Sequence, residues 1–370
     1  MNIQSHSDLV PGPVREAVQG IIDCDIHPSM KSMADYLPFL SQRWQDHLRT
    51  YGAFTREPLT DTLAYPRMAP EISRADAWPP DGGTPGSDLP FMQKQHLDPM
   101  NVETGILIAL RSRAPDQRNL QFGAALATAA NNWQKSEWLE KDHRLRGSII
   151  ITHDYPEEAV KEIERCAADK SFVQILMPPR SMEPLGRRRY WPIYEAAAKN
   201  SLPIALHVGG TSGHPVTSSG WVSYYMEEHH SNVQAMEAFV TSIVLEGVFE
   251  AFPDLKIVLV EGGFAWVPSL CWRLDKHWQR LRSEVPHLKM APSQYVKRNI
   301  WYTTQPLDEP ERAKDFATLC DWVGYDRILF ASDYPHWDFD DPRYAFKSRI
   351  SEQDRNSIMR VNARSVYGLG

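Results

Sequence analysis

Short, almost continuously apolar runs recur along the chain, and most are followed by a segment with helical spacing. Such runs are typical of parallel strands that are buried on both faces of a sheet. We predict eight strands, at Ile21–Ile26, Thr104–Leu110, Gly147–Thr152, Phe172–Met177, Pro203–Val208, Lys256–Val260, Ile300–Thr304 and Arg327–Ala331. Helices are predicted between them, among others at Pro156–Ala168, Pro192–Asn200, Val233–Ala251 and Glu309–Trp322. This alternation favours an α/β fold of the (β/α)₈ TIM-barrel type over an open doubly wound sheet.

Two stretches interrupt the alternation. Residues 28–98, after the first predicted strand, are rich in proline and longer than an ordinary connection. Residues 209–230, after the fifth, are rich in glycine and serine and contain several aromatic residues. Loops that follow the strands of a barrel lie at its C-terminal face, where catalytic sites are found. We therefore expect one domain, 1–370, in which 209–230 is an active-site loop and 28–98 is either a pocket wall or a surface excursion.

The composition excludes several classes of protein. Of the 370 residues, 42% are hydrophobic and 24% charged, which is ordinary for a globular chain. The net charge of −7 provides no basic surface for nucleic acid or an anionic membrane. Four scattered cysteines without CxxC spacing fit a reducing compartment. Neither a signal peptide nor a membrane-spanning run is recognisable. We expect a cytoplasmic protein that acts on a small molecule, as a homo- or hetero-oligomer.

Acidic and imidazole side chains stand at the ends of four predicted strands. They are Asp25, His27, His207, Glu261, Asp333 and His336. Asp25 and His27 are two residues apart, so both project to the same side of a strand. Taken singly, His207 could be a hydrogen-bonded core histidine and Asp333 a helix N-cap. Because strand ends meet at one rim of a closed barrel, the set together predicts a metal site, and its ligands suit zinc, manganese or iron.

At these residues the chain resembles the amidohydrolase-2 family, which includes aminocarboxymuconate semialdehyde and γ-resorcylate decarboxylases. The resemblance runs from IIDCDIHP to the terminal VNARSVYGL. Asp25-Ile26-His27 is similar to the family's acid-x-His motif, His207 to its fifth-strand histidine, and Asp333 in LFASDYPHW to its eighth-strand aspartate. The resemblance implies one divalent ion, Zn, Mn or Fe, held by these four residues. Glu261 and His336 are further candidate ligands.

One triplet departs from the decarboxylase pattern, which has His-Gly-Gly after the sixth strand where this chain has Glu261-Gly262-Gly263. A glutamate can carry protons, and it can also bridge two metal ions. A branch of the family, including an aminoisobutyrate hydroxylase, is similar in using a dinuclear centre to hydroxylate C–H bonds. The alternatives are therefore a dinuclear iron or manganese oxygenase, with two ions, or a metal-binding partner subunit of such an enzyme.

The leading hypothesis is a metal-dependent hydrolase or a non-oxidative decarboxylase that acts on a small carboxylated molecule. In this scheme Glu261 or Asp333 accepts or supplies a proton while His207 remains a ligand. Arg180 can bind a carboxylate through two hydrogen bonds, or it can form a surface salt bridge. Further substrate contacts are expected from aromatic and imidazole residues after the fifth strand. These are Trp221, Tyr224, His229 and His230. The two histidines could instead lie at the solvated start of a helix.

Overall fold

The computed structural model describes residues 20–53, 69–208 and 217–370. Eight parallel strands lie in one sheet in the order of the sequence. They are β1 (Ile21–Ile26), β2 (Val102–Leu107), β3 (Leu145–Ile150), β4 (Phe172–Met177), β5 (Ile204–His207), β6 (Ile257–Val260), β7 (Ile300–Thr303) and β8 (Ile328–Leu329). Backbone hydrogen bonds from Cys24 N to Phe330 O and from His27 N to Tyr334 O join β1 to β8 and the segment that follows it. The predicted (β/α)₈ barrel is therefore confirmed.

The strand bounds differ slightly from the predicted ones. β1 and β4 are as predicted, whereas β2 and β3 begin two residues earlier, at Val102 and Leu145. Val102 is aligned with Ile21 at the start of β1, so pairing with a neighbour decides where β2 begins. Apolar periodicity cannot reveal such pairing, because it depends on a strand distant in sequence.

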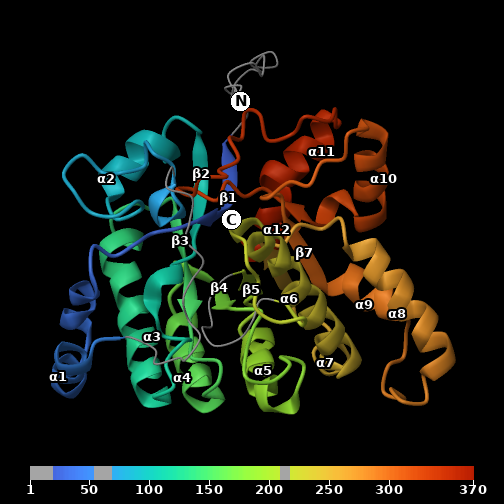
Figure 1. Cartoon of the computed structure of the whole chain (residues 1–370), viewed down its shortest axis with the longest axis horizontal. Coiled ribbons are helices and arrows are strands. Elements are labelled where there is room, and N and C mark those ends of the chain that lie inside the picture. Colours follow the sequence, from blue (N-terminus) through green and yellow to red (C-terminus); the bar gives the residue numbers. More distant parts are fainter. Residues whose placement is uncertain (1–19, 54–68, 209–216) are drawn as a thin grey trace.

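Helices surround the strands (Figure 1). They are α1 (Gln42–Tyr51), α2 (Leu89–Met92), α3 (Leu120–Gln134), α4 (Pro156–Ala167), α5 (Trp191–Lys199), α6 (Tyr225–Leu245), α7 (Val248–Ala251), α8 (Val267–Leu281), α9 (Pro292–Asn299), α10 (Ala313–Val323), α11 (Glu352–Asn356) and α12 (Asn362–Tyr367). No helix within the described ranges is both long and apolar enough to cross a membrane.

The segment after β5 corrects the sequence prediction. We expected a loop over 209–230 and a helix over Val233–Ala251, but α6 already begins at Tyr225. Two glutamates in its first turn complement the helix dipole and favour this early start. The predicted helix also breaks at Gly247, whose φ of 81° places it in the left-handed region. Residues 209–216 of the expected loop lie outside the described residues.

The insertion after β1 pairs with the segment that follows β8. The backbone N–H of Trp337 donates to the carbonyl of Ile72 at 2.9 Å, and that of Arg74 donates to the carbonyl of Pro335 at 3.0 Å. The insertion is therefore hydrogen-bonded to the segment that directly follows Asp333. Its residues 54–68 lie outside the described part of the chain.

Candidate metal centre

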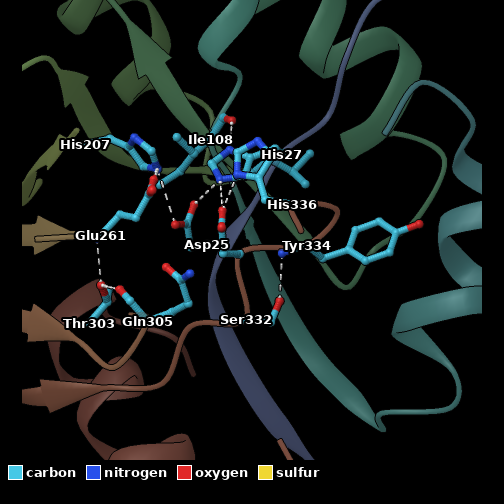
Figure 2. Close-up of polar contacts among 12 residues, drawn as sticks. Asp25, His27, Ile108, His207, Glu261, Thr303, Gln305, Ser332, Tyr334 and His336 are labelled. Carbon is cyan, nitrogen blue, oxygen red and sulfur yellow. Dashed lines mark hydrogen bonds and ion pairs between the residues drawn. The ribbon is translucent and has the colours of Figure 1, made fainter. Parts of the chain in front are cut away.

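Five side chains from four strand ends meet in one group at the C-terminal rim of the barrel. Figure 2 labels four of them, Asp25, His27, His207 and Glu261. Asp25 and His27 lie at the end of β1, His207 ends β5, and Glu261 and Asp333 come shortly after β6 and β8. One potential ligand atom from each lies within 4.8 Å of every other. The structure thus brings together the four ligands implied by the resemblance, with Glu261 beside them.

The two histidines of the group are oriented by backbone carbonyls. His27 Nδ1 lies 2.9 Å from the carbonyl of Ile108, and His207 Nδ1 lies 2.7 Å from that of Val208. Because a carbonyl only accepts, each ring carries a proton on Nδ1 and directs Nε2 into the group. An outer hydrogen bond of this kind fixes the tautomer of metal-binding histidines.

Carboxylate oxygens surround both Nε2 atoms. That of His27 lies 2.8 Å from Asp333 Oδ1 and 3.1 Å from Asp25 Oδ1. That of His207 lies 3.0 Å from Glu261 Oε2 and 3.4 Å from Asp25 Oδ2. With Nδ1 already protonated, each Nε2 must either take a second proton or give its lone pair to a cation.

The buried carboxylates of the group favour a positive charge beside them. Burial opposes a charge on His207, but the carboxylates of Asp25 and Glu261 outweigh it and raise the pKa to about 10. Burial also opposes the charge of Asp25, but His27 and His207 lower the pKa of that carboxyl below its usual range. Both oxygens of Asp25 and Oδ2 of Asp333 are buried, and none of them receives a well-aligned hydrogen bond from a described residue. Buried polar atoms rarely lack partners, so these residues fit a divalent cation.

Glu261 and Asp333 have an unusual backbone. Their φ angles of 57° and 62° lie in the left-handed region, which costs non-glycine residues on the order of 1–3 kcal/mol each. Hydrogen bonds hold both: Glu261 N donates to Thr303 Oγ1 at 3.1 Å, and Asp333 N donates to the carbonyl of Asp25 at 3.1 Å. Strain at two neighbouring carboxylates is typical of a functional site.

The same two carboxyl groups retain protons more readily than usual. Burial raises the pKa of Asp333 to about 8. Contact with His27 lowers this pKa, but burial together with repulsion from Asp25 and Asp338 outweighs that effect. Burial and the charge of Asp333 also raise the pKa of Glu261. In the metal-free chain Asp333 can therefore hold a proton near neutral pH, and Glu261 holds its proton to a higher pH than an exposed glutamate does.

His336 lies beside the five-residue group and not in it. Its Nδ1 lies 2.6 Å from Asp333 Oδ1, and its ring stacks on that of His27 with centroids 4.3 Å apart. Burial and the charge of His27 lower the pKa of His336 to about 3, so its ring is neutral. Because a carboxylate accepts, Nδ1 donates to Asp333 and orients it.

A second group of possible ligands adjoins the first through Glu261. It consists of His229, Glu261 and Asp338. His229 Nε2 lies 3.3 Å from Asp338 Oδ2 and 4.0 Å from Glu261 Oε1, whereas Glu261 Oε2 faces His207. The two oxygens of Glu261 thus point toward different groups. The site role of Asp338 was missed from the sequence; its only signal was the acidic run that follows Asp333.

A polar cavity of about 120 Å³ opens beside Glu261. Its lining includes Arg180, His207, Tyr225, Glu228, His229, Asn232, Glu261, His336, Trp337 and Asp338. Four of these share one face of α6, because positions 225, 228, 229 and 232 follow helical spacing. Sequence reasoning missed Glu228 and Asn232 because it read their segment as a loop or left it unassigned.

Three expected substrate contacts are not part of this lining. Trp221 and Tyr224 have 52% and 73% of their surface exposed, and His230 is exposed as well. Arg180 and His229 do line the cavity. His230 lies on the side of α6 that faces solvent, whereas Trp221 and Tyr224 precede the helix.

An apolar cavity of about 80 Å³ adjoins the polar one and shares Leu110, His207 and Val208 with it. The rest of its lining is mainly aliphatic: Ala109, Ser112, Pro115, Asp116, Ile150, Leu176, Met177 and Pro178. Ligand sites commonly combine such an apolar region with a few polar groups that fix orientation.

A closed barrel with histidines and carboxylates at the ends of β1, β5, β6 and β8 defines a metal-dependent enzyme that works at the C-terminal rim. The family model described as amidohydrolase matches residues 22–369. The chain belongs to this family, so the enzyme class expected from the sequence is confirmed.

Relatives with a named activity resemble this chain at low sequence identity. The γ-resorcylate decarboxylase of Polaromonas sp. is 27% identical over 296 residues, which cover 76% of this chain and 88% of that protein. The structure of a dihydroxybenzoic acid decarboxylase from the same organism, with manganese and 2-nitroresorcinol, matches with a TM-score of 0.66 and 22% identity over 95% of this chain and 98% of that one. A 5-carboxyvanillate decarboxylase mutant from Novosphingobium aromaticivorans, with manganese, matches with a TM-score of 0.71 and 19% identity over 96% and 98%. At these identities the structural matches show a shared fold.

Proposed function

We propose that this protein is a metal-dependent, non-oxidative decarboxylase of a small carboxylated molecule with a flat, apolar body. The observation that carries the proposal is the five-residue ligand group, of which His207 lines both the polar and the apolar cavity and Glu261 lines the polar one. The similarity to decarboxylases of carboxylated aromatic compounds supports it.

The residues of the site are proposed to have different roles. Asp25, His27, His207 and Asp333 are proposed to hold one divalent ion, which when bound supplies positive charge to orient and polarise a carboxylate. Decarboxylation breaks the bond between a carbon and its carboxylate, releases CO2, and leaves an electron pair that takes up a proton. Glu261, whose pKa is raised by burial, is the candidate to supply that proton, and Asp333 is the alternative. His207 has a fixed tautomer and remains a ligand.

Arg180 is the proposed contact for an anionic group of the substrate. It lines the polar cavity, where burial lowers the pKa of its guanidinium while Glu228 and Asp116 oppose that shift. A desolvated guanidinium binds a carboxylate more strongly than an exposed one. The aliphatic cavity on the other side of His207 would take the flat body. His229 lines the polar cavity and is proposed to contact substrate there.

The number of ions separates this proposal from the oxygenase alternative. A second ion would use His229, Glu261 and Asp338, with Glu261 as the bridge. The relatives reported above are decarboxylases and do not favour an oxygenase. A partner-subunit role would require an isolated chain that binds metal but has no activity of its own.

The test combines elemental analysis with product detection. Protein purified without added metal is analysed for Zn, Mn and Fe, then incubated without oxygen with a panel of hydroxylated benzoates. We expect one ion per chain and release of CO2 from at least one substrate. Two ions per chain with substrate-dependent oxygen consumption, and no CO2 under anaerobic conditions, would refute the proposal.

A further inference from the structure

A buried hydrogen-bond network lies at the join between β1 and the segment after β8. It is formed by Asp23, His96 and Ser332, each with 0% of its surface exposed. Asp23 is on β1, Ser332 directly precedes Asp333, and His96 belongs to the helical turn Gln93–Leu97 near the end of the insertion. Three parts of the chain that are distant in sequence therefore meet beside the ligand group.

Asp23 is the acceptor at the centre of this network. Ser332 donates to it twice, from Oγ to Oδ2 at 2.6 Å and from its backbone N–H to Oδ1 at 2.9 Å. His96 Nε2 lies 2.8 Å from Oδ2, and it donates because a carboxylate only accepts. Ser332 Oγ also accepts from the backbone N–H of Tyr334 at 3.1 Å. The network thus fixes the backbone on both sides of Asp333.

The network is coupled directly to the ligands. Oδ1 of Asp23 also lies 3.3 Å from the backbone N–H of Asp25, and Asp333 N donates to the carbonyl of Asp25. Asp333 has a φ of 62°, a conformation that persists only where its surroundings enforce it. The contacts of Asp23 and Ser332 supply that enforcement.

The insertion also contacts the segment after β8 through Tyr334. The ring of His96 stacks on that of Tyr334 with centroids 4.6 Å apart and planes 8° apart. The hydroxyl of Tyr334 donates to Gln95 Oε1 at 2.8 Å. The turn that carries His96 therefore contacts the segment after β8 through both its imidazole and its neighbour Gln95.

We infer that His96 is a positioning residue for the metal centre: through Asp23 and Ser332 it sets the spacing between the β1 ligands and Asp333. This gives the insertion a role in metal binding although it contributes no ligand. The inference rests on the proposed metal-dependent function. Loss of an outer partner of a metal ligand typically weakens metal binding by about 10- to 100-fold.

The test compares variants that keep or remove the donor at the position of Nε2. The amide nitrogen of His96→Gln can reach Asp23, whereas that of His96→Asn is too short. Ser332→Ala removes a second donor to the same carboxylate. The matched control is Gln93→Ala, which lies on the same turn but donates to Asp142 Oδ2 at 2.8 Å, away from the network. For each variant we would measure the Kd of Mn²⁺, the EPR spectrum of bound Mn²⁺, and the Tm of the metal-free chain.

We expect His96→Asn and Ser332→Ala to weaken Mn²⁺ binding by about 10- to 100-fold and to alter the EPR spectrum. His96→Gln should restore both, and Gln93→Ala should match the wild type whatever its Tm. Wild-type affinity in His96→Asn, or an equal loss in Gln93→Ala, would overturn the inference. If His96→Asn does not fold, Ser332→Ala takes its place in the comparison with Gln93→Ala, because it removes another donor to Asp23. Wild-type affinity in Ser332→Ala would then overturn the inference. A wild-type chain that binds no Mn²⁺ would refute the metal site itself, which is a different result from unequal variants.

Discussion

Metal binding by this protein should strengthen steeply as the pH rises. In the metal-free chain the carboxylates of Asp25 and Glu261 raise the pKa of His207 to about 10, against burial, which opposes its charge. A cation must therefore displace a proton from Nε2 to bind there. Metal ligands bind in their deprotonated form, so affinity is coupled to pH in this direction.

The magnitude follows from that pKa. Between pH 6 and pH 9 His207 stays protonated without metal, so each pH unit should raise the metal affinity at least about tenfold, or about 1.4 kcal/mol. Below about pH 8 the proton held by Asp333 adds to this dependence. At pH 7, about three units below the pKa, the competing proton weakens binding by about 1000-fold relative to the deprotonated site. Carboxylates also raise the pKa of His27, against its burial, so a second released proton would steepen the slope.

The assay is a titration of the metal-free chain with Mn²⁺ at several pH values, by calorimetry in two buffers of different ionisation enthalpy. The buffer dependence of the heat gives the number of protons released, which should be at least one. Exposed His143 is a suitable control, because its replacement by Gln should leave the slope unchanged. A Kd that stays constant from pH 6 to pH 9 would refute the assignment of His207 as a ligand.

Three further predictions concern single residues. His207→Ala and Asp333→Ala should each lose the metal. The Tm of the metal-free chain should change little, because the C-terminal rim contributes little to barrel stability. Full metal content in both variants would contradict the ligand set. Glu261→Gln should keep one ion and lower kcat by about 100-fold or more if the glutamate carries a proton, whereas a loss of metal by elemental analysis would identify a ligand. Arg180→Lys should raise KM by about 10- to 100-fold with kcat nearly unchanged, since lysine cannot make the paired hydrogen bonds of a guanidinium; the exposed Arg187→Lys is its control, and an unchanged KM would exclude the substrate contact.

The cluster of candidate ligands was predictable because it depends on local regularities. A strand places residues two apart on one side, and parallel strands bring their carboxyl ends to one rim. Asp25, His27, His207 and Asp333 could therefore be named from strand ends alone. Glu261 was named as well, but its left-handed backbone was not visible in the sequence.

The cavity walls were harder to predict, because they depend on where a helix begins. Tyr225 and Asn232 line the polar cavity because α6 starts before the predicted helix. Trp221 and Tyr224 precede that start and face solvent. An aromatic residue in a polar segment has no pattern that distinguishes these two outcomes.

The sequence by itself determined the barrel, the strand end that carries each candidate ligand, and the family, because periodic apolar runs and motifs within a few residues are local properties. Only the tertiary structure decided which oxygen faces which nitrogen, that Glu261 adjoins two groups of ligands, and that His96 reaches Asp23. Those contacts join residues far apart in the chain, and their geometry follows from how strands and helices pack around them.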